Sequence, residues 1–202
     1  MCRDRWLLPA DAGPSPLLNA TAPSAKGAEW TMTNIEIKAH CADPRRIEDH
    51  LNDLGAGPAG TFAQKDIYFN VAEGRLKLRQ LGPDEGHLIF YQRPDEAGPK
   101  RSDYDIAFTT DPAALEAMLT KVLGTRAVVE KTRQVWLWEN VRIHVDDVQG
   151  LGQFIELEAV SEEQDLEEST RRVKTLMRAL EIDSDRLVEV SYGDLIAAQQ
   201  PQ

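Results

Sequence analysis

The sequence predicts an α+β protein built on an antiparallel eight-stranded β-barrel, closed or nearly closed, with helices packed on the outside. Eight segments alternate apolar with polar residues, as strands with one buried face do. Most are joined by connections of hairpin length, which is typical of antiparallel sheets. Three further segments carry the apolar stripe of amphipathic helices, and these stripes need the apolar side of a sheet to pack on.

The first 31 residues differ from the rest of the chain. They hold four of the eleven prolines and show no apolar period. The apolar run Trp6-Leu7-Leu8 ends at Pro9, which is too short for the core of a secretory signal. We expect residues 1–31 to be a disordered or wrongly assigned extension, with Met32 as the start and one folded domain over residues 32–198.

The expected elements follow in order along the chain. The predicted strands are residues 34–40, 64–70, 75–80, 87–93, 101–108, 128–138, 141–148 and 153–160. Two predicted helices, at 43–54 and 111–123, share one design: an aspartate cap, a proline in the first turn and a glycine at the end. A third, at 161–182, begins with Ser161 and Gln164 at capping-box spacing, and a short helix follows at 191–198.

Composition limits the classes of partner. The chain has 202 residues, 42% hydrophobic content and a net charge of −11, which argues against nucleic acid because phosphate backbones attract basic surfaces. No apolar run approaches the roughly 20 residues that cross a bilayer. Cys2 and Cys41 form no disulfide framework, so we expect a cytoplasmic protein.

Charged residues share one face on five of the predicted strands. If helices cover the apolar outer face, these charged faces converge inside the barrel, where charges need partners or a ligand. The faces are Asn34, Glu36 and Lys38; Arg75, Lys77 and Arg79; Lys131 and Arg133; Arg142, His144 and Asp146; Glu156 and Glu158. Cations dominate the middle strands and carboxylates the first and last, which suits a polyanion with a divalent cation at one end.

The motifs on these strands resemble those of the CYTH, or triphosphate tunnel metalloenzyme, family. They are NIEIK at 34–38, KDIYF at 65–69, LKLR at 76–79, EKTR at 130–133 and VDDVQGLGQFIELE at 145–158. The resemblance covers about residues 33–198 and implies a triphosphate tunnel through the barrel. The family includes class IV adenylyl cyclases, thiamine triphosphatases and inorganic triphosphatases.

The resemblance implies roles for individual residues. Glu36, Glu156 and Glu158 match carboxylates that bind Mg²⁺ or Mn²⁺, and Lys38, Arg133 and Asp146 match catalytic positions. The implied substrate-binding residues are Lys38, Lys77, Arg79, Arg93, Arg101, Lys131, Arg133 and Arg142. Two positions depart from the family pattern: Asn34 replaces a glutamate, and Gln92 replaces a lysine common in cyclases. Arg93 is adjacent, but a shift by one residue turns a side chain to the other face of a strand.

Other candidate residues carry weaker signals. The four histidines, at positions 40, 50, 87 and 144, have no metal-ligand spacing, and only His144 lies on a predicted inner face. Trp136 and Trp138 lie opposite Lys131 and Arg133, so we expect them to pack under a helix.

The implied activity is that of a class IV adenylyl cyclase, which converts ATP into cyclic AMP and pyrophosphate. Three alternatives stay open: a hydrolase of tripolyphosphate, nucleoside or thiamine triphosphate; a non-catalytic triphosphate sensor, which Asn34 favours; and a barrel interaction module with a solvated charged face. The expected partner is a small-molecule triphosphate, with no nucleic acid and no membrane, and the oligomeric state stays open, a homodimer included.

Overall fold

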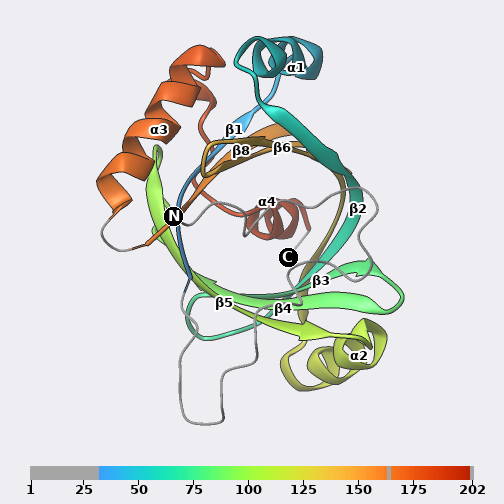
Figure 1. The fold of residues 1–202 in the computed structure, drawn as a ribbon. Helices are drawn as coiled ribbons and strands as arrows, with labels where there is room; N and C mark the ends of the chain where they lie inside the picture. The colour runs from blue at the N-terminus through green and yellow to red at the C-terminus, as the bar shows by residue number, and fades with distance from the viewer. Residues whose placement is uncertain (1–31, 163–164, 201–202) are drawn as a thin grey trace.

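Eight antiparallel strands close into a barrel in the computed structural model, which describes residues 32–162 and 165–200 (Figure 1). The strands are β1 Met32–His40, β2 Gly57–Phe69, β3 Arg75–Gly82, β4 Glu85–Gln92, β5 Lys100–Thr109, β6 Thr125–Trp138, β7 Val141–Val148 and β8 Gly152–Ser161. Their order around the barrel is β1-β5-β4-β3-β2-β6-β7-β8, and β8 pairs with β1 to close the ring. The predicted fold class is confirmed.

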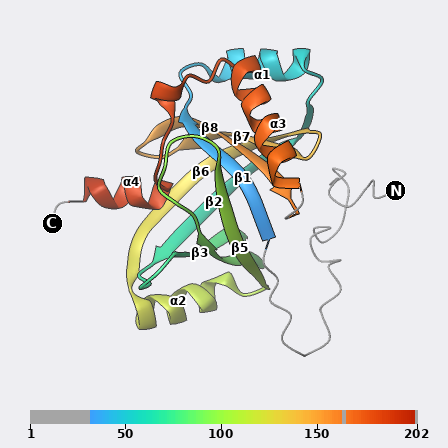
Figure 2. The ribbon, with the colours of Figure 1, turned by 90° about the vertical axis from the view of Figure 1, so that its left-hand side faces the viewer.

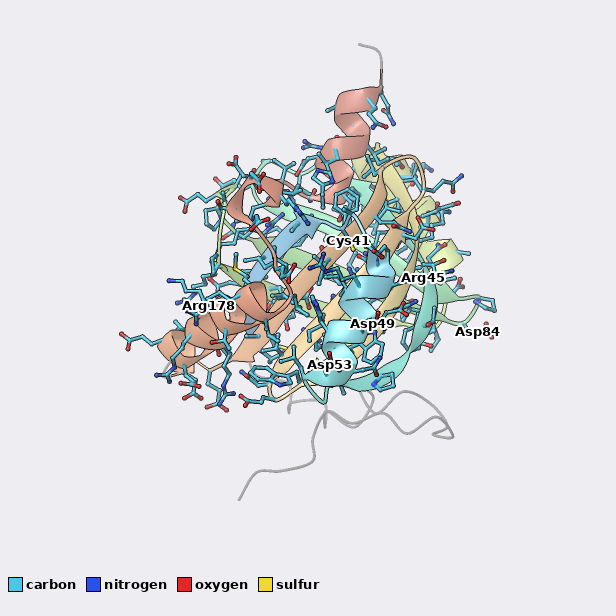
Figure 3. All side chains as sticks on the ribbon, turned by 90° about the horizontal axis from the view of Figure 1, so that it is seen from above. Cys41, Arg45, Asp49, Asp53, Asp84 and Arg178 are labelled. Atoms are coloured by element: carbon cyan, nitrogen blue, oxygen red, sulfur yellow. The ribbon has the colours of Figure 1, made fainter. Side chains whose placement is uncertain are left out.

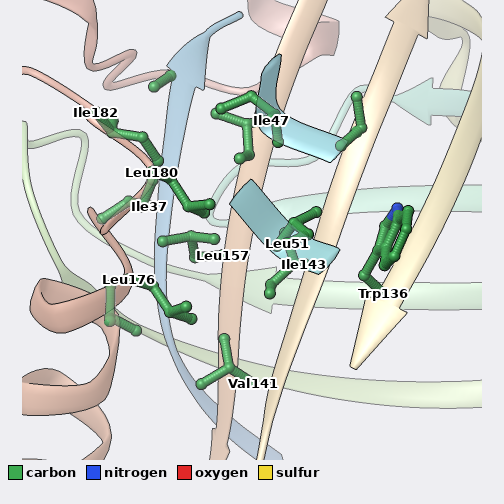
Figure 4. Close-up of a cluster of buried hydrophobic side chains, with 14 of the residues drawn as sticks. Ile37, Ile47, Leu51, Trp136, Val141, Ile143, Leu157, Leu176, Leu180 and Ile182 are labelled. Carbon is green, nitrogen blue, oxygen red and sulfur yellow. The ribbon is translucent and has the colours of Figure 1, made fainter. Parts of the chain in front are cut away.

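Two helices cover the apolar outer face of β1, β7 and β8. They are α1 (Pro44–Asp53) and α3 (Leu166–Ala179) (Figure 2). Ile47 and Leu51 from α1 join Leu176 from α3 in one buried cluster over Ile143 and Leu157 (Figure 4). Trp136 packs in the same cluster, as expected. The opposite face of α1 points to solvent along Arg45, Asp49 and Asp53 (Figure 3). The amphipathic stripe therefore fixes which side of the sheet is the outside.

A third helix, α2 (Pro112–Leu123), covers another part of the barrel wall. Its Leu115, Leu119 and Leu123 pack against Ile67 and Leu78 of the sheet. Both aspartate caps form as predicted: Asp43 accepts a hydrogen bond from the Arg46 amide at 3.2 Å, and Asp111 accepts one from the Ala114 amide at 3.0 Å. Local sequence signals therefore set where these two helices begin.

The predicted start of the third helix is wrong. Ser161 is the last residue of β8, where it pairs with Thr33, and its hydroxyl lies 2.6 Å from that of Ser169. Helix α3 begins at Leu166 without a side-chain cap bond. Gln164, the other half of the predicted capping box, lies outside the described residues, as do residues 1–31. Closure of the barrel at β8 therefore takes Ser161 into the sheet.

The last helix, α4 (Tyr192–Gln199), does not pack on the outside as predicted. It lies across one end of the barrel (Figure 1). Ser191 and Asp194 form a capping box at its start, and Tyr192 joins the apolar cluster inside the barrel. A Cβ added at Gly193 would lie 2.7 Å from Cγ of Tyr68, so only glycine lets the helix approach this closely. Among the described residues, no helix is long and apolar enough to span a membrane.

Candidate active site

Strand alternation turns the predicted charged faces into the barrel. Lys38, Arg133 and Asp146 are at most 6% exposed, whereas the apolar residues between them face the helices. Arg75 shares this inward face and pairs with Asp95 and Asp194. The other inward charges among the described residues, here called the tunnel set, comprise eight cations and five carboxylates. They are Lys38, Lys77, Arg79, Arg93, Lys100, Lys131, Arg133 and Arg142, with Glu36, Asp66, Asp146, Glu156 and Glu158. With every group ionised, the tunnel set therefore has an excess of three positive charges in a chain of net charge −11.

Asp66 organises the cations of β3. Arg79 donates two hydrogen bonds to it, both at 2.8 Å, and Lys77 donates a third at 3.3 Å. Burial opposes the charge of Asp66, but Arg79 and Lys77 outweigh it and hold the pKa of this carboxyl well below its usual range. The sequence analysis missed Asp66. It alternates with Ile67 in the KDIYF motif, and this alternation was the available signal.

Asp146 plays the same part for β6. It accepts hydrogen bonds from Arg133 at 2.7 and 2.6 Å and from the Tyr192 hydroxyl at 3.0 Å. The pKa of Asp146 is lowered because Arg133 and Lys131 outweigh the effect of burial. With two hydrogen bonds from Arg133 and one from Tyr192, Asp146 lies behind Arg133. It therefore orients the guanidinium of Arg133.

Lys131 lies between the two buried aspartates. Its Nζ is 3.8 Å from Asp66 and 3.6 Å from Asp146. Burial and the neighbouring Arg133 lower the pKa of Lys131 to about 7, although both aspartates act in the opposite direction. Lys131 is therefore only partly protonated near pH 7, and a bound anion would favour its protonated, charged form.

Carboxylates gather where β1 meets β8, and each has a cationic partner. Glu156 makes ion pairs with Lys38 and Arg133, whereas Glu158 lies 3.2 Å from Arg142. Burial opposes the charge of Glu156, but Lys38 and Arg133 hold its pKa well below the usual range. The pKa of Glu158 falls to about 2 because His144 and Arg142 outweigh burial. Both carboxylates are therefore ionised at neutral pH.

Glu36 has a different environment. It lies opposite Glu158 in the pairing of β1 with β8, and its closest cation is Arg93 at 3.2 Å. Burial raises the pKa of Glu36, and the neighbouring Glu158 and Glu156 act in the same direction. A divalent cation here would relieve the repulsion among the three carboxylates.

His144 faces the carboxylates from β7. Its Nδ1 is 3.5 Å from Glu156 and 3.6 Å from Glu158. Ligand atoms of these three residues all lie within 4.8 Å of one another, so they could hold a metal ion. Sequence spacing gave no hint of this, because His144 meets Glu156 only through the register of the β7–β8 pair.

The two departures from the family pattern have clear structural contexts. Asn34 is 4% exposed, and its amide oxygen accepts a hydrogen bond from Tyr104 at 3.3 Å. Gln92 is exposed at the end of β4, while Arg93 continues the inward alternation of Ile89 and Tyr91. The side chain of Arg93 is only 2% exposed. The adjacent arginine therefore does reach the tunnel.

Arg101 does not join the tunnel set. Its side chain is 42% exposed and contacts Asp103 at 2.9 Å, on the other side of β5 from Lys100. The inward cation on this strand is Lys100, which donates to the carbonyl oxygens of Glu96 and Glu189 at 2.8 and 3.0 Å. The sequence analysis missed Lys100 because the strand register, which decides between neighbours, is not visible in GPKRSDY.

A cavity of about 690 Å³ lies beside α4 at the end of the barrel. Arg93 lines both this cavity and the tunnel, and polar residues from several elements complete the lining. These include Arg75, Gln92, Asp95, Arg126 and Asp194. The volume falls in the usual range for small-molecule sites, about 300–1,000 Å³.

Tyr192 reaches into the tunnel from α4. Its ring centroid is 3.9 Å from Nζ of Lys38 and 4.9 Å from Nζ of Lys131. The negative face of an aromatic ring attracts a cation placed over it. Tyr192 thus contributes to the tunnel lining, a role that the apolar pattern of the last helix did not indicate.

Three comparisons bear on the identity of this site. The family model described as CYTH domain matches residues 32–192. The curated protein "Putative adenylate cyclase MJ0240" of Methanocaldococcus jannaschii is 26% identical over 172 residues, covering 81% of this chain and 98% of that protein.

Two solved structures share the fold. The PH1012 protein of Pyrococcus horikoshii OT3 has a TM-score of 0.72 at 20% identity, over 81% of this chain and 99% of that one. A Hippeastrum protein, described as a putative adenylyl cyclase with a dominant triphosphatase activity, has a TM-score of 0.58 at 14% identity, over 85% of this chain and 97% of that one. At these identities the likenesses concern the fold alone.

Proposed function

Because the chain belongs to the CYTH domain family, we propose that it is a divalent-metal-dependent enzyme that binds a triphosphate in its barrel and converts ATP into cyclic AMP and pyrophosphate. One observation carries the proposal: buried cations in excess of carboxylates line the inside of an otherwise acidic protein. Such a surplus is stable only with a bound anion or at a cost in folding free energy. The name of the Methanocaldococcus relative agrees with this activity.

In this proposal the tunnel residues have three different roles. Lys77, Arg79, Lys131 and Arg133 bind phosphate oxygens, and Asp66 and Asp146 hold the two arginines in fixed orientations. Lys38 and Arg133 stabilise charge that develops on the phosphate in the transition state. Mg²⁺ or Mn²⁺ held by Glu36, Glu156 and Glu158 would neutralise further phosphate charge.

The cyclase reaction needs room for a nucleoside at one end of the triphosphate. The cavity beside Arg93 supplies about 690 Å³ with hydrogen-bonding groups in its lining. The ribose 3′-hydroxyl attacks the α-phosphorus and releases its proton to water, the new O3′–P bond forms, and the P–O bond to the departing pyrophosphate breaks. This requires a bent nucleotide, with its base outside the charged part of the tunnel.

Hydrolysis of a triphosphate is the second candidate. The tunnel would bind the same phosphates, and water would attack the terminal phosphorus instead of a ribose oxygen. The Hippeastrum protein of the same fold is described with a dominant triphosphatase activity, which favours this candidate. Gln92 does not decide between the two activities, because Arg93 supplies the inward cation next to it. A non-catalytic sensor is the third candidate, favoured by Asn34.

A product panel decides among these activities. The protein is incubated with ATP, GTP, thiamine triphosphate or tripolyphosphate, in Mg²⁺ or Mn²⁺, and cyclic nucleotide, pyrophosphate and phosphate are measured. Cyclic AMP with equimolar pyrophosphate supports the cyclase; phosphate release alone supports the hydrolase; and no turnover in excess metal supports the sensor.

A matched pair of lysines controls for surface charge. Lys77→Met removes a tunnel cation, whereas Lys65→Met removes a cation that pairs with Glu116 on the α2 side of the barrel. Loss of one charge-assisted contact to phosphate costs about 1.5–3 kcal/mol, so kcat/KM should fall about 10- to 100-fold in Lys77→Met. Lys65→Met should leave it unchanged. Equal losses in both variants would contradict the proposed site.

A further inference from the structure

Two carboxylates and an imidazole converge on one point of the tunnel wall. Glu156 and Glu158 lie on the inner face of β8, and His144 is the direct pairing partner of Glu156 on β7. His144 Nδ1 is 3.5 Å from one carboxylate and 3.6 Å from the other. Bonds of about 2.0–2.2 Å to one metal ion place neighbouring ligand atoms roughly 3–4 Å apart. The two distances from His144 match that spacing, and all three ligand atoms lie within 4.8 Å of one another.

The imidazole nitrogen has no hydrogen bond of normal geometry. Within the described part of the chain, Nδ1 of His144 contacts Glu156 and Glu158 only at 3.5 and 3.6 Å, although the side chain is only 6% exposed. A buried polar atom left without a partner is destabilising and is uncommon in folded proteins. A neutral imidazole can offer its nitrogen lone pair to a metal.

The first strand supplies less to a metal than the family pattern implies. Asn34 stands in place of a carboxylate, and its amide oxygen accepts from Tyr104. Glu36, Glu156 and Glu158 all have a cationic partner, so ion pairing does not distinguish them. Ligand atoms of His144, Glu156 and Glu158 lie within 4.8 Å of one another, and this group does not include Glu36.

We propose that His144 is a metal ligand, which together with Glu156 and Glu158 forms a mixed imidazole–carboxylate site that binds a first-row transition metal in preference to Mg²⁺. Magnesium is bound almost entirely by oxygen, whereas imidazole suits transition metals. The inference rests on the proposed function for its setting and adds a ligand and a metal preference to it.

The test uses Mn²⁺ alone with the untagged full chain. Pulsed electron paramagnetic resonance detects a ¹⁴N nucleus bound to Mn²⁺, and the free-ion signal gives the dissociation constant. We expect nitrogen modulation in the wild type, its loss in His144→Gln, and Mn²⁺ binding weakened at least about tenfold in that variant. Mg²⁺ competition should show a smaller change, so that the preference for Mn²⁺ over Mg²⁺ falls.

The matched control is His50→Gln on α1, outside the barrel, which should behave as the wild type. Should His144→Gln fail to fold, a variant with His40→Gln, His50→Gln and His87→Gln keeps His144 as the only one of the four histidines and should retain the modulation. Absence of nitrogen modulation in the wild type, its persistence in His144→Gln, its loss in the triple variant, or no Mn²⁺ binding at all would each overturn the inference.

Failure of this inference is distinguishable from failure of the proposed function. Tripolyphosphate binding without metal, read as a thermal shift, depends on the tunnel cations alone. A shift without nitrogen modulation removes His144 from the metal site and leaves the triphosphate tunnel intact. The absence of any such shift counts against the tunnel itself.

Discussion

Lys131 is the residue whose charge in the tunnel is most sensitive to pH. Its folded-state pKa of about 7 lies below the ordinary value of about 10.4. A bound triphosphate stabilises the charged ammonium and raises that pKa, so binding above pH 7 must take up a proton. Affinity should therefore decrease as pH rises through 7, by up to about tenfold per pH unit.

Isothermal titration calorimetry with tripolyphosphate in buffers of different ionisation enthalpy measures that proton uptake at pH 8. Lys131→Arg keeps the charge at every pH and should reduce the uptake and flatten the pH dependence. The phosphates and Lys100, which has a pKa of about 8, titrate in both proteins. Identical proton uptake by the two proteins would exclude Lys131 as the source.

Glu156 and Glu158 should differ in their effect on folding. Glu156 is the buried partner of Lys38 and Arg133, and breaking a buried ion pair typically costs about 3–5 kcal/mol. Glu158 pairs with Arg142, whose side chain is 34% exposed, so its removal should cost less than the removal of Glu156. Urea unfolding of Glu156→Gln and Glu158→Gln, followed by tryptophan fluorescence without metal, measures both values. Equal stabilities, or a less stable Glu158→Gln, would contradict these pairings.

Strand alternation is the part of the site that could be predicted from sequence. It identified Lys77, Arg79, Lys131 and Arg133 as inward residues without any knowledge of the fold. It could not identify their partners. Asp66 lies opposite Arg79, and Asp146 opposite Arg133, only because the β2–β3 and β6–β7 registers put them there. Turn geometry sets those registers, so a side-chain pattern does not reveal them.

The packing position of helix α4 was the feature of the fold that the sequence predicted least well. Its apolar residues predicted a helix, but the place where it packs depends on long-range contacts. Arg75 and Arg126 both bind Asp194, at 2.9 and 2.8 Å, and Tyr192 enters the tunnel. These contacts join the C-terminal helix to β3 and β6, far away in sequence.

Gly193→Ala tests this docking. The added methyl would lie 2.7 Å from the ring of Tyr68, so α4 must shift, at an expected cost of about 1–3 kcal/mol. Trypsin should then cleave faster after Arg186, at the exposed turn that precedes α4. The control Gly57→Ala adds the same methyl where no atom lies within 4 Å and should change neither stability nor cleavage. Wild-type stability and cleavage in Gly193→Ala would mean that α4 is not held against Tyr68.

At the scale of the whole molecule, the fold was predictable because the residue pattern of the strands and that of the helices indicated the same arrangement. Strands with one charged and one apolar face, together with helices carrying single apolar stripes, leave a barrel with its polar face inward as the consistent arrangement. The strand order was not predictable, because β1 pairs with both β5 and β8 through contacts distant in sequence. Ser161 illustrates the same limit. Its capping-box spacing indicated the start of a helix, but Ser161 instead pairs with Thr33 where β8 closes the barrel against β1.

The central claim is that the excess of three positive charges in the tunnel exists to bind a triphosphate. The most direct test is the melting temperature of the protein with phosphate, pyrophosphate and tripolyphosphate at equal ionic strength. Each added phosphate reaches more of the tunnel set, so the shift should rise along the series, and tripolyphosphate at 100 times its dissociation constant should add about 2.7 kcal/mol to the free energy of unfolding. Arg79→Ala should reduce this shift while the variant remains folded. Equal shifts from all three anions, or an undiminished shift in Arg79→Ala, would contradict the claim.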